Sequence, residues 1–245
     1  MVDGVKQPTS LGVPQGGPLS PLLANIVLHE LDRYLEAQGH RFARYADDFV
    51  ICVRSARAAQ RVKANVTRFL KQRLKLDINH DKSRIVSSND LEFLGFGFRG
   101  TKIVWSDKAL HRFKHRVREL TGRSWGVSME YRYKELRSYV SGWLNYYALS
   151  EYYRPIPELD EWLRRRLRTC YWKQWRWPRT KIRHLLAMGI KLKDAIIAGM
   201  SSKGPYCMSR TKVTQMAMTN AWLKQQGLIS IKETWTRFHY PASTA

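Results

Sequence analysis

Two adjacent carboxylates, Asp47 and Asp48, precede an apolar run that extends to Val53. Residues 41–53 can form two short strands with the acidic pair at the turn between them. Neighbouring side chains alternate between the faces of a strand, but a tight turn breaks this alternation, so both carboxylates can reach one side. Carboxylate oxygens suit Mg²⁺, and two such ions about 3.5–4 Å apart can serve a nucleotidyl transfer.

A solvated turn is the alternative interpretation of the same residues. Aspartate is a common turn residue, and an Asp-Asp pair between two strands often binds nothing. The two flanking strands favour the metal site, because they would hold both carboxylates at one end of a hairpin.

The elements around the acidic pair indicate an α+β region. Segment 11–21 holds three prolines and three glycines, which excludes a helix interior there. Ser20, as N-cap, and Pro21 then begin a helix that Gly39 ends. The apolar residues of this helix recur at helical spacing: Leu22, Leu23, Ile26, Val27, Leu31 and Leu35. The further predicted elements are an amphipathic helix over 56–74, short strands near 76–78 and 85–86, and a hairpin over 93–105.

The pattern becomes helical after residue 106. We predict an α+β domain over 1–106, with helices on one face of an antiparallel sheet, followed by an all-α domain over 107–245. The helices are expected near 107–121, 131–150, 157–176, 180–188, 191–199 and 209–226.

Net charge and tryptophan content change at the same boundary. The chain of 245 residues carries a formal net charge of +23, to which residues 101–245 contribute +18 and residues 1–100 only +5. All nine tryptophans also lie in the second part. A basic, aromatic-rich region predicts a polyanionic partner, most simply nucleic acid.

Other compartments and partners are disfavoured. No apolar run of about 18 residues occurs, so the sequence predicts no membrane partner, and residues 1–5 do not resemble a secretory signal. The cysteines, Cys52, Cys170 and Cys207, are too far apart for a zinc motif or a disulfide framework. A cytoplasmic location is the expectation.

Four sequence blocks occur in order and together resemble a known family. They are Gly12 to Ile26, Arg44-Tyr45-Ala46-Asp47-Asp48, Asn79-His80-Asp81-Lys82-Ser83 and Phe93-Leu94-Gly95-Phe96. This set resembles the palm of bacterial group II intron reverse transcriptases, also called maturases. Residues 107–245 are similar to the thumb, or X, maturase domain of that family, through segments 203–211 and 220–228. Retron reverse transcriptases would not explain residues 200–228.

The resemblance implies an RNA-directed DNA polymerase that uses two Mg²⁺ ions, deoxynucleoside triphosphates, an RNA template and a DNA primer. Asp47 and Asp48 would be two of three metal-binding aspartates. Leu94 and Gly95 would form a grip on the primer, although Gly95 could equally mark a β-bulge without a ligand. The nucleotide and template pocket would be formed by Pro14, Gln15, Gly16, Tyr45, Ala46 and Lys82, of which Lys82 could instead be a solvated lysine.

The densest basic and aromatic stretch lies in the second part of the chain. Its cations are predicted to bind the phosphates of intron RNA. The alternative is a helix with a buried apolar stripe, from Trp162 to Tyr171, and arginines that face outward. The candidate RNA-binding residues are Arg164, Arg165, Arg166, Arg168, Lys173, Arg176, Lys203 and Arg210.

The block that carries the third aspartate in the family would precede residue 1. Asp3, Asp32 and Glu36 are nearby acidic residues, and a solvated helix face is the default for Asp32 and Glu36. We therefore expect a truncated, split or trimmed protein, with a missing N-terminal half or a second subunit as a candidate partner. Alternative functions are a non-catalytic RNA-binding splicing cofactor and a nonfunctional mobile-element remnant.

Overall fold

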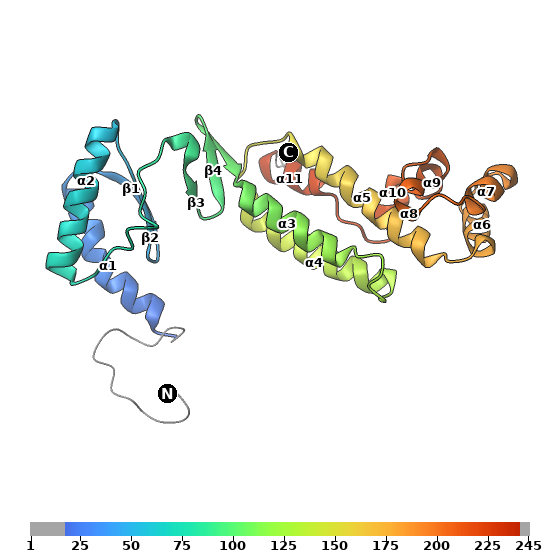
Figure 1. Cartoon of the computed structure of the whole chain (residues 1–245), viewed down its shortest axis with the longest axis horizontal. Coiled ribbons are helices and arrows are strands. Elements are labelled where there is room, and N and C mark those ends of the chain that lie inside the picture. The colour runs from blue at the N-terminus through green and yellow to red at the C-terminus, as the bar shows by residue number, and fades with distance from the viewer. Residues whose placement is uncertain (1–17, 241–245) are drawn as a thin grey trace, which may run out of the picture. The chain divides into compact units, whose positions relative to one another are not determined.

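The computed structural model describes residues 18–240, which divide into two compact units after Ser87. Unit 1 extends to Ser87 and unit 2 begins at Ser88. Within 18–240, antiparallel strands occur only before Ser106 and helices alone follow, so the predicted order of an α+β region and an all-α region is confirmed (Figure 1). No helix of the described residues is long and apolar enough to cross a membrane.

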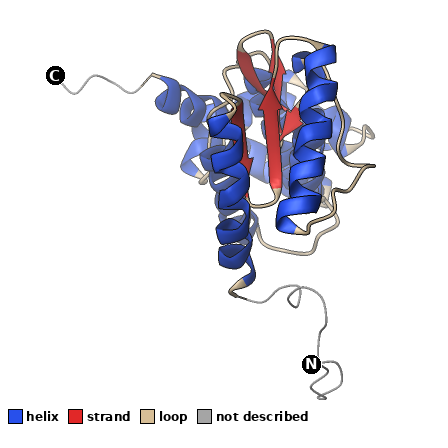
Figure 2. Cartoon of the chain, turned by 90° about the vertical axis from the view of Figure 1, so that its left-hand side faces the viewer, coloured by secondary structure: helices blue, strands red, loops and turns tan. Residues whose placement is uncertain are grey.

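Unit 1 consists of a β-hairpin between two helices. Helix α1 (Ser20–Ala37) precedes strands β1 (Arg41–Tyr45) and β2 (Asp48–Cys52), which pair antiparallel. Helix α2 (Ala56–Phe69) follows and continues as a π-helical turn (Leu70–Leu74), so helical backbone covers the predicted range 56–74. Figure 2 shows helices on either side of strands in projection, and both helices of unit 1 pack on one face of its hairpin.

The predicted C-terminal end of α1 is confirmed, and the predicted N-terminal end is not. Gly39 has a φ of 69°, and its amide donates to the Glu36 carbonyl, so it ends the helix as expected. The predicted N-cap is wrong by one residue, because Ser20 is the first helical residue and Leu19 is the N-cap. Pro21 lies in the first turn, where its missing amide hydrogen costs nothing.

The core of unit 1 lies on one face of the hairpin. Phe42 is the register partner of Ile51, and Arg44 is that of Phe49, so these four side chains share a face. The three apolar ones pack against a buried cluster from both helices, formed by Leu28, Leu31, Leu35, Val66 and Leu70. The predicted apolar face of α1 is correct only in its second half, because Leu22, Leu23, Ile26 and Val27 are exposed.

The two short strands predicted after α2 are wrong. Residues 75–79 and 83–87 form irregular backbone, and Leu76, Ile85 and Val86 are exposed. Asn79 instead makes a turn in which its side-chain oxygen accepts from the backbone amides of Asp81 and Lys82, each over 3.1 Å. Apolar residues with β-propensity do not form a strand without a partner strand to pair with.

Unit 2 begins with a separate three-stranded sheet. A 3₁₀ turn (Ser88–Asp90) leads into β3 (Glu92–Phe93), β4 (Phe96–Arg99) and β5 (Lys102–Trp105), which pair in that order. This sheet contains the predicted hairpin over 93–105. The indole nitrogen of Trp105 donates to the Tyr147 carbonyl over 2.9 Å, so the sheet packs on the helical part of unit 2.

The ends of the long helices of unit 2 lie within three residues of their predicted positions. They are α3 (Asp107–Leu120), α4 (Met129–Tyr147), α5 (Pro155–Gln174), α6 (Pro178–Ala187) and α7 (Leu192–Gly199). The single helix predicted over 209–226 is wrong, because Thr219 caps a new helix there with its side chain. The short C-terminal helices are α8 (Pro205–Met208), α9 (Lys212–Ala217), α10 (Asn220–Gln225) and α11 (Ile231–His239).

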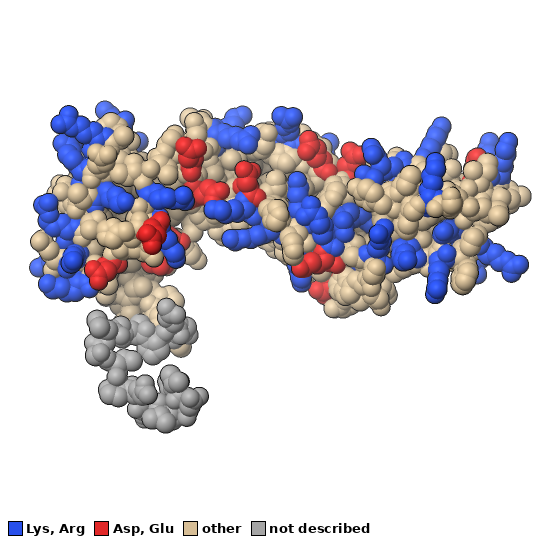
Figure 3. Space-filling view, in the orientation of Figure 1, with Lys and Arg blue, Asp and Glu red and all other residues tan. Residues whose placement is uncertain are grey.

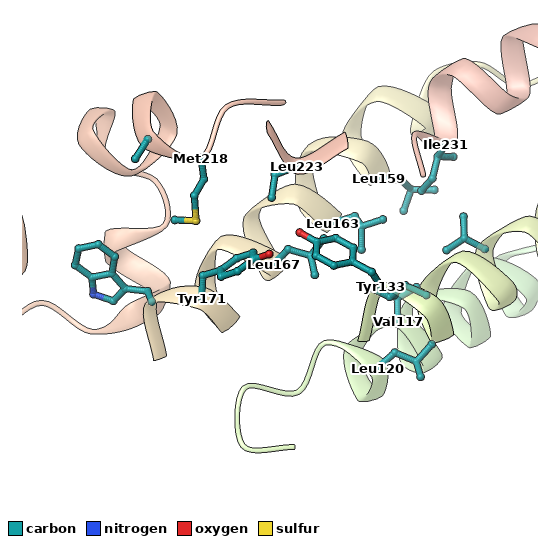
Figure 4. Close-up of a cluster of buried hydrophobic side chains, with 14 of the residues drawn as sticks. Val117, Leu120, Tyr133, Leu159, Leu163, Leu167, Tyr171, Met218, Leu223 and Ile231 are labelled. Atoms are coloured by element: carbon teal, nitrogen blue, oxygen red, sulfur yellow. The ribbon is translucent and has the colours of Figure 1, made fainter. Parts of the chain in front are cut away.

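Helix α5 is the centre of the core of unit 2. Its residues Leu163 and Leu167 are buried between Val117 of α3, Tyr133 of α4 and Leu223 of α10 (Figure 4). The predicted stripe is confirmed for the residues that follow, since Cys170 and Tyr171 are also buried, while Trp162 is half-buried. Burial of such side chains contributes roughly 1.5–3 kcal/mol each, so this helix organises unit 2.

Candidate active site and nucleic-acid interface

The acidic pair lies at the tip of the β1–β2 hairpin. Tyr45 and Asp48 are the last register pair, which leaves Ala46 and Asp47 as a two-residue loop. Ala46 has a φ of 53°, a left-handed conformation that costs a residue other than glycine about 1–2 kcal/mol. Strained backbone of this kind persists only where surrounding contacts hold it, and it is concentrated at functional sites.

Both carboxylates are open to solvent. Asp48 shares its face of the hairpin with Tyr45, opposite to the face that packs on the helices. Asp47 and Asp48 are exposed, and neither carboxylate makes a hydrogen bond or ion pair with the described part of the chain. Unpaired carboxylate oxygens are suitable ligands for Mg²⁺. Among residues 18–240, however, no three His, Cys, Asp or Glu side chains gather closely enough to hold an ion by themselves.

An arginine holds this turn from the opposite face. Arg44 Nε and Nη2 donate to the two carboxylate oxygens of Asp32 over 2.8 and 2.5 Å, and Nη1 donates to Asn25 Oδ1 and the Ala46 carbonyl, each over 2.9 Å. The hydrogen bond to Asp32 raises the pKa of Arg44, partly opposed by burial. Asp32 is therefore not a solvated residue of a helix face, as expected from sequence, but a partner of Arg44.

Sequence reasoning missed this contact, although a signal was present. Asn25 and Asp32 are separated by seven residues, which places both on one side of α1. Arg44 follows Phe42 by two residues, so its position in β1 faces the helices. A polar pair on the inner side of a helix facing an inward-pointing arginine predicts an ion pair.

The other predicted pocket residues are only partly described. Pro14, Gln15 and Gly16 lie outside the described residues. Lys82 is exposed in the Asn79 turn of unit 1, where its backbone amide, but not its side chain, is hydrogen-bonded to the described part of the chain. Its ammonium group is thus available to an anionic ligand.

Leu94 and Gly95 form the two-residue loop between β3 and β4. Both have positive φ, 52° and 80°, as a tight hairpin turn with right-handed strand twist requires. The Leu94 carbonyl accepts from Tyr146 Oη over 3.1 Å, and a Cβ atom at Gly95 would overlap Tyr147 Oη. The glycine is explained by the turn and by Tyr147, and neither a bulge nor a ligand is needed for it.

Two of the predicted RNA-binding arginines are structural. Arg168 is 7% exposed and donates to the Met218 carbonyl over 2.9 Å and to Asn220 Oδ1 over 3.1 Å. Arg166 is half-buried and donates to the Arg118 carbonyl over 3.1 Å and to the hydroxyl of Thr121, so it caps the end of α3. Burial lowers the pKa of both guanidinium groups. The prediction that the arginines of α5 face outward is wrong for these two. Both donate hydrogen bonds to carbonyls of neighbouring helices.

Arg164 and Arg165 are also held within unit 2. Arg164 forms an ion pair with Asp160 over 3.3 Å, and the guanidinium of Arg165 lies 3.6 Å from the centre of the Tyr206 ring. The four remaining predicted cations are exposed, and they lie at the end of α5 and on either side of α8. They are Lys173, Arg176, Lys203 and Arg210.

The surface of unit 2 is rich in positive charge. On the face shown in Figure 3, many Lys and Arg side chains project from the region of α5 to α7, with few Asp or Glu among them. Such a surface attracts polyanions through the release of their counterions.

Two protein families match consecutive parts of the chain. Residues 2–98 match the family of reverse transcriptases, described as RNA-dependent DNA polymerases. Residues 110–188 match the maturase-specific domain of group II introns. The first region contains the acidic hairpin and the second contains most of the helical core around α5.

Individual relatives agree with this pairing. Protein YkfC of Escherichia coli is 33% identical over 41% of this chain and 34% of its own length. The group II intron-encoded protein LtrA of Lactococcus lactis is 28% identical over 37% of this chain and 26% of its own length. A putative COX1/OXI3 intron 2 protein of Saccharomyces cerevisiae is 27% identical over 38% of this chain and 18% of its own length.

The chain thus spans about a third or less of the length of the curated relatives it matches. Within that span, the acidic hairpin lies in the reverse transcriptase region and the α5 core in the maturase-specific region. On one polypeptide, the chain therefore combines a reverse transcriptase region with a maturase-specific region of group II introns.

Proposed function

We propose that this protein takes part in RNA-directed DNA synthesis on intron RNA, with Asp47 and Asp48 as ligands of catalytic Mg²⁺. The observation that carries the proposal is the pair of exposed, unpaired carboxylates on a strained hairpin turn within a reverse transcriptase region. Template, primer and deoxynucleoside triphosphates are the proposed substrates. The three free cysteines are compatible with the bacterial cytoplasm as the proposed location.

The residues of the chain have separate proposed roles in this reaction. Bound Mg²⁺ would supply activation of the primer hydroxyl and stabilisation of the leaving pyrophosphate. Asp47 and Asp48 would hold the ions, and the ammonium of Lys82 would bind the triphosphate electrostatically. Tyr45 and Ala46, with Pro14, Gln15 and Gly16, would line the nucleotide and template pocket, and the turn at Leu94 and Gly95 would contact the primer.

We further propose that these residues do not complete DNA synthesis by themselves. Among residues 18–240, no third acidic side chain joins Asp47 and Asp48 to hold an ion. A further palm segment or a second subunit would supply it. We also propose residue 106 as the boundary between palm and thumb sequence, which is supported by matched regions that end at 98 and begin at 110.

Intron RNA binding, in support of splicing, is the second proposed function. It is supported by the net charge of +23 and by the exposed cations around α5 and α8. This function needs phosphate contacts only, so it does not depend on a complete metal site.

The metal site predicts a selective loss of ion binding. Replacing Asp47 or Asp48 by Asn is expected to weaken Mn²⁺ binding to the chain at least tenfold, because each change removes an anionic ligand. Mn²⁺ serves as a paramagnetic probe for Mg²⁺, and binding is measured by electron paramagnetic resonance. The control is Asp81→Asn, a change of an exposed aspartate in a turn of unit 1. Equal binding by all variants would exclude the site.

RNA binding is expected to depend on the exposed cations. A variant with Gln at Lys173, Arg176, Lys203 and Arg210 should bind single-stranded intron RNA at least tenfold more weakly at about 0.1 M salt. At this salt concentration the Debye length is about 10 Å, so cations close to the RNA still attract it. The slope of log K against log salt should fall by up to about 3, since each lost phosphate contact removes about 0.7. Filter binding at several salt concentrations measures both quantities.

A charge-matched control separates this surface from net charge. The control variant carries Gln at four exposed cations of α2 and its extension, Arg57, Arg61, Lys71 and Arg73. It loses the same four charges, so a smaller loss of affinity assigns binding to the α5 and α8 region. An equal loss in both variants would show that only the total charge matters.

A further inference from the structure

The guanidinium of Arg44 connects two parts of unit 1 that differ in backbone character. On one side lie Asn25 and Asp32, on the regular backbone of α1. On the other side lies the Ala46 carbonyl, in the left-handed turn. Nε, Nη1 and Nη2 all donate hydrogen bonds, so the position of the guanidinium relative to α1 and the turn is defined.

The bond to Ala46 acts on the peptide that precedes Asp47. A carbonyl and the following amide are one planar group, so fixing the Ala46 oxygen fixes the plane of the Ala46–Asp47 peptide. The direction of the Asp47 side chain depends on that plane. A left-handed Ala46 is unfavourable by itself and persists only while such contacts hold it.

The same ion pair keeps positive charge away from the acidic pair. Arg44 is only two residues before Ala46, and an unpaired guanidinium there could bind the carboxylate of Asp47 or Asp48 itself. Asp32 occupies it instead, and both side chains are largely buried, with 13% and 19% exposure. Lys82 and Arg41, two other cations of unit 1, form no ion pair with Asp47 or Asp48 within the described part of the chain.

We propose that Arg44 is a positioning residue for the metal-binding carboxylates, anchored on α1 by Asp32 and Asn25 and acting through the Ala46 carbonyl. The inference rests on the proposed metal site at Asp47 and Asp48. Asp32, which is an acidic residue close to that site in sequence, serves the arginine and is not itself a metal ligand.

The test compares Arg44→Lys with Arg41→Lys in the full 245-residue chain. Lysine keeps the positive charge but cannot bond Asp32 through two nitrogens and Ala46 through a third. Arg41 lies on the same strand, with its exposed side chain on the opposite face, so its replacement is a matched control. Asp32→Asn is a second variant, which frees the guanidinium without removing it.

Two measurements are made on each variant. Mn²⁺ affinity is followed by electron paramagnetic resonance, and amide hydrogen exchange is followed at residues 45–48. Arg44→Lys and Asp32→Asn are expected to weaken Mn²⁺ binding about tenfold and to speed exchange in the turn at least tenfold. Exchange in α2 should be unchanged, which shows that unit 1 remains folded.

The outcomes separate the two proposals. Wild-type Mn²⁺ affinity and turn exchange in Arg44→Lys and Asp32→Asn would overturn the positioning role. A loss of Mn²⁺ binding together with rapid exchange throughout α2 would also overturn it, since Arg44 would then be needed for the fold and not for the turn. If the wild-type chain binds no Mn²⁺ at Asp47 and Asp48, the metal site fails, and unchanged turn exchange in the variants would reject the positioning role independently.

Discussion

Replacing Gly95 by Ala is expected to lower the free energy of unfolding of unit 2 by about 2–5 kcal/mol. Of this, about 1–2 kcal/mol comes from a side chain in the left-handed conformation, because Gly95 has a φ of 80°. A further 1–3 kcal/mol, roughly, comes from overpacking, because the new Cβ would overlap the hydroxyl of Tyr147 on α4.

Chemical denaturation followed by tryptophan fluorescence measures this change. All nine tryptophans of the chain lie in unit 2, so the signal reports that unit selectively. The experiment thus measures how the turn at Leu94 and Gly95 contributes to the packing of the sheet on α4, in the absence of nucleic acid.

Two further variants divide the effect into its causes. Gly100→Ala is the matched control, because Gly100 has a φ of 62° but a Cβ there would meet nothing within 4 Å among the described residues. It should lose about 1–2 kcal/mol, the conformational part alone. Tyr147→Phe combined with Gly95→Ala should recover part of the packing loss, because it removes the overlapping hydroxyl. Equal losses at Gly95 and Gly100 would contradict the packing explanation.

Replacing Asp160 by Ala is expected to destabilise unit 2 by about 3–5 kcal/mol, as is usual when one partner of a buried ion pair is removed. Asp160 is 5% exposed and accepts from the hydroxyl of Ser230 over 2.8 Å and from the amide of Ile231 over 2.7 Å. It also pairs with Arg164. These contacts attach the start of α11 to α5, across 70 residues of sequence.

The local consequence should be the release of α11. Trp235 of this helix is buried, and its indole nitrogen donates to the Ser150 carbonyl over 2.9 Å, so detachment should change its fluorescence. Glu158→Ala is the control, an exposed acidic residue on the same helix, and should cost at most about 1 kcal/mol. A similar loss in both variants would show that the charge of α5, and not the contact with α11, stabilises the unit.

The packing of β3–β5 shows that the two matched regions do not coincide with the two structural units. The sheet contains the last residues of the reverse transcriptase match, yet Trp105 and Phe96 pack on Trp143 and Tyr147 of α4. The contact boundary therefore falls after Ser87, earlier than a boundary drawn from residue types. A change in the helical region, as at Tyr147, is expected to reach the turn at Gly95 through direct contact.

The sequence by itself determined the local elements and the chemistry of the acidic pair. Period and turn residues predicted the β1–β2 hairpin, α2 and the long helices of unit 2, because these depend on interactions within a few residues. The four blocks in order predicted the family. The acidic pair could be placed near the hairpin tip because turn formation is local as well, although the loop itself is Ala46 and Asp47, and Asp48 begins β2.

Only the tertiary structure decided which polar side chains serve the fold. In sequence Arg168 looks like any exposed arginine, yet its partner Met218 lies 50 residues away. The break at Thr219 and the exposure of the first half of α1 likewise depend on which distant elements come into contact. Burial of a side chain is set by neighbours that chain folding brings together, and a local pattern carries no information on their position.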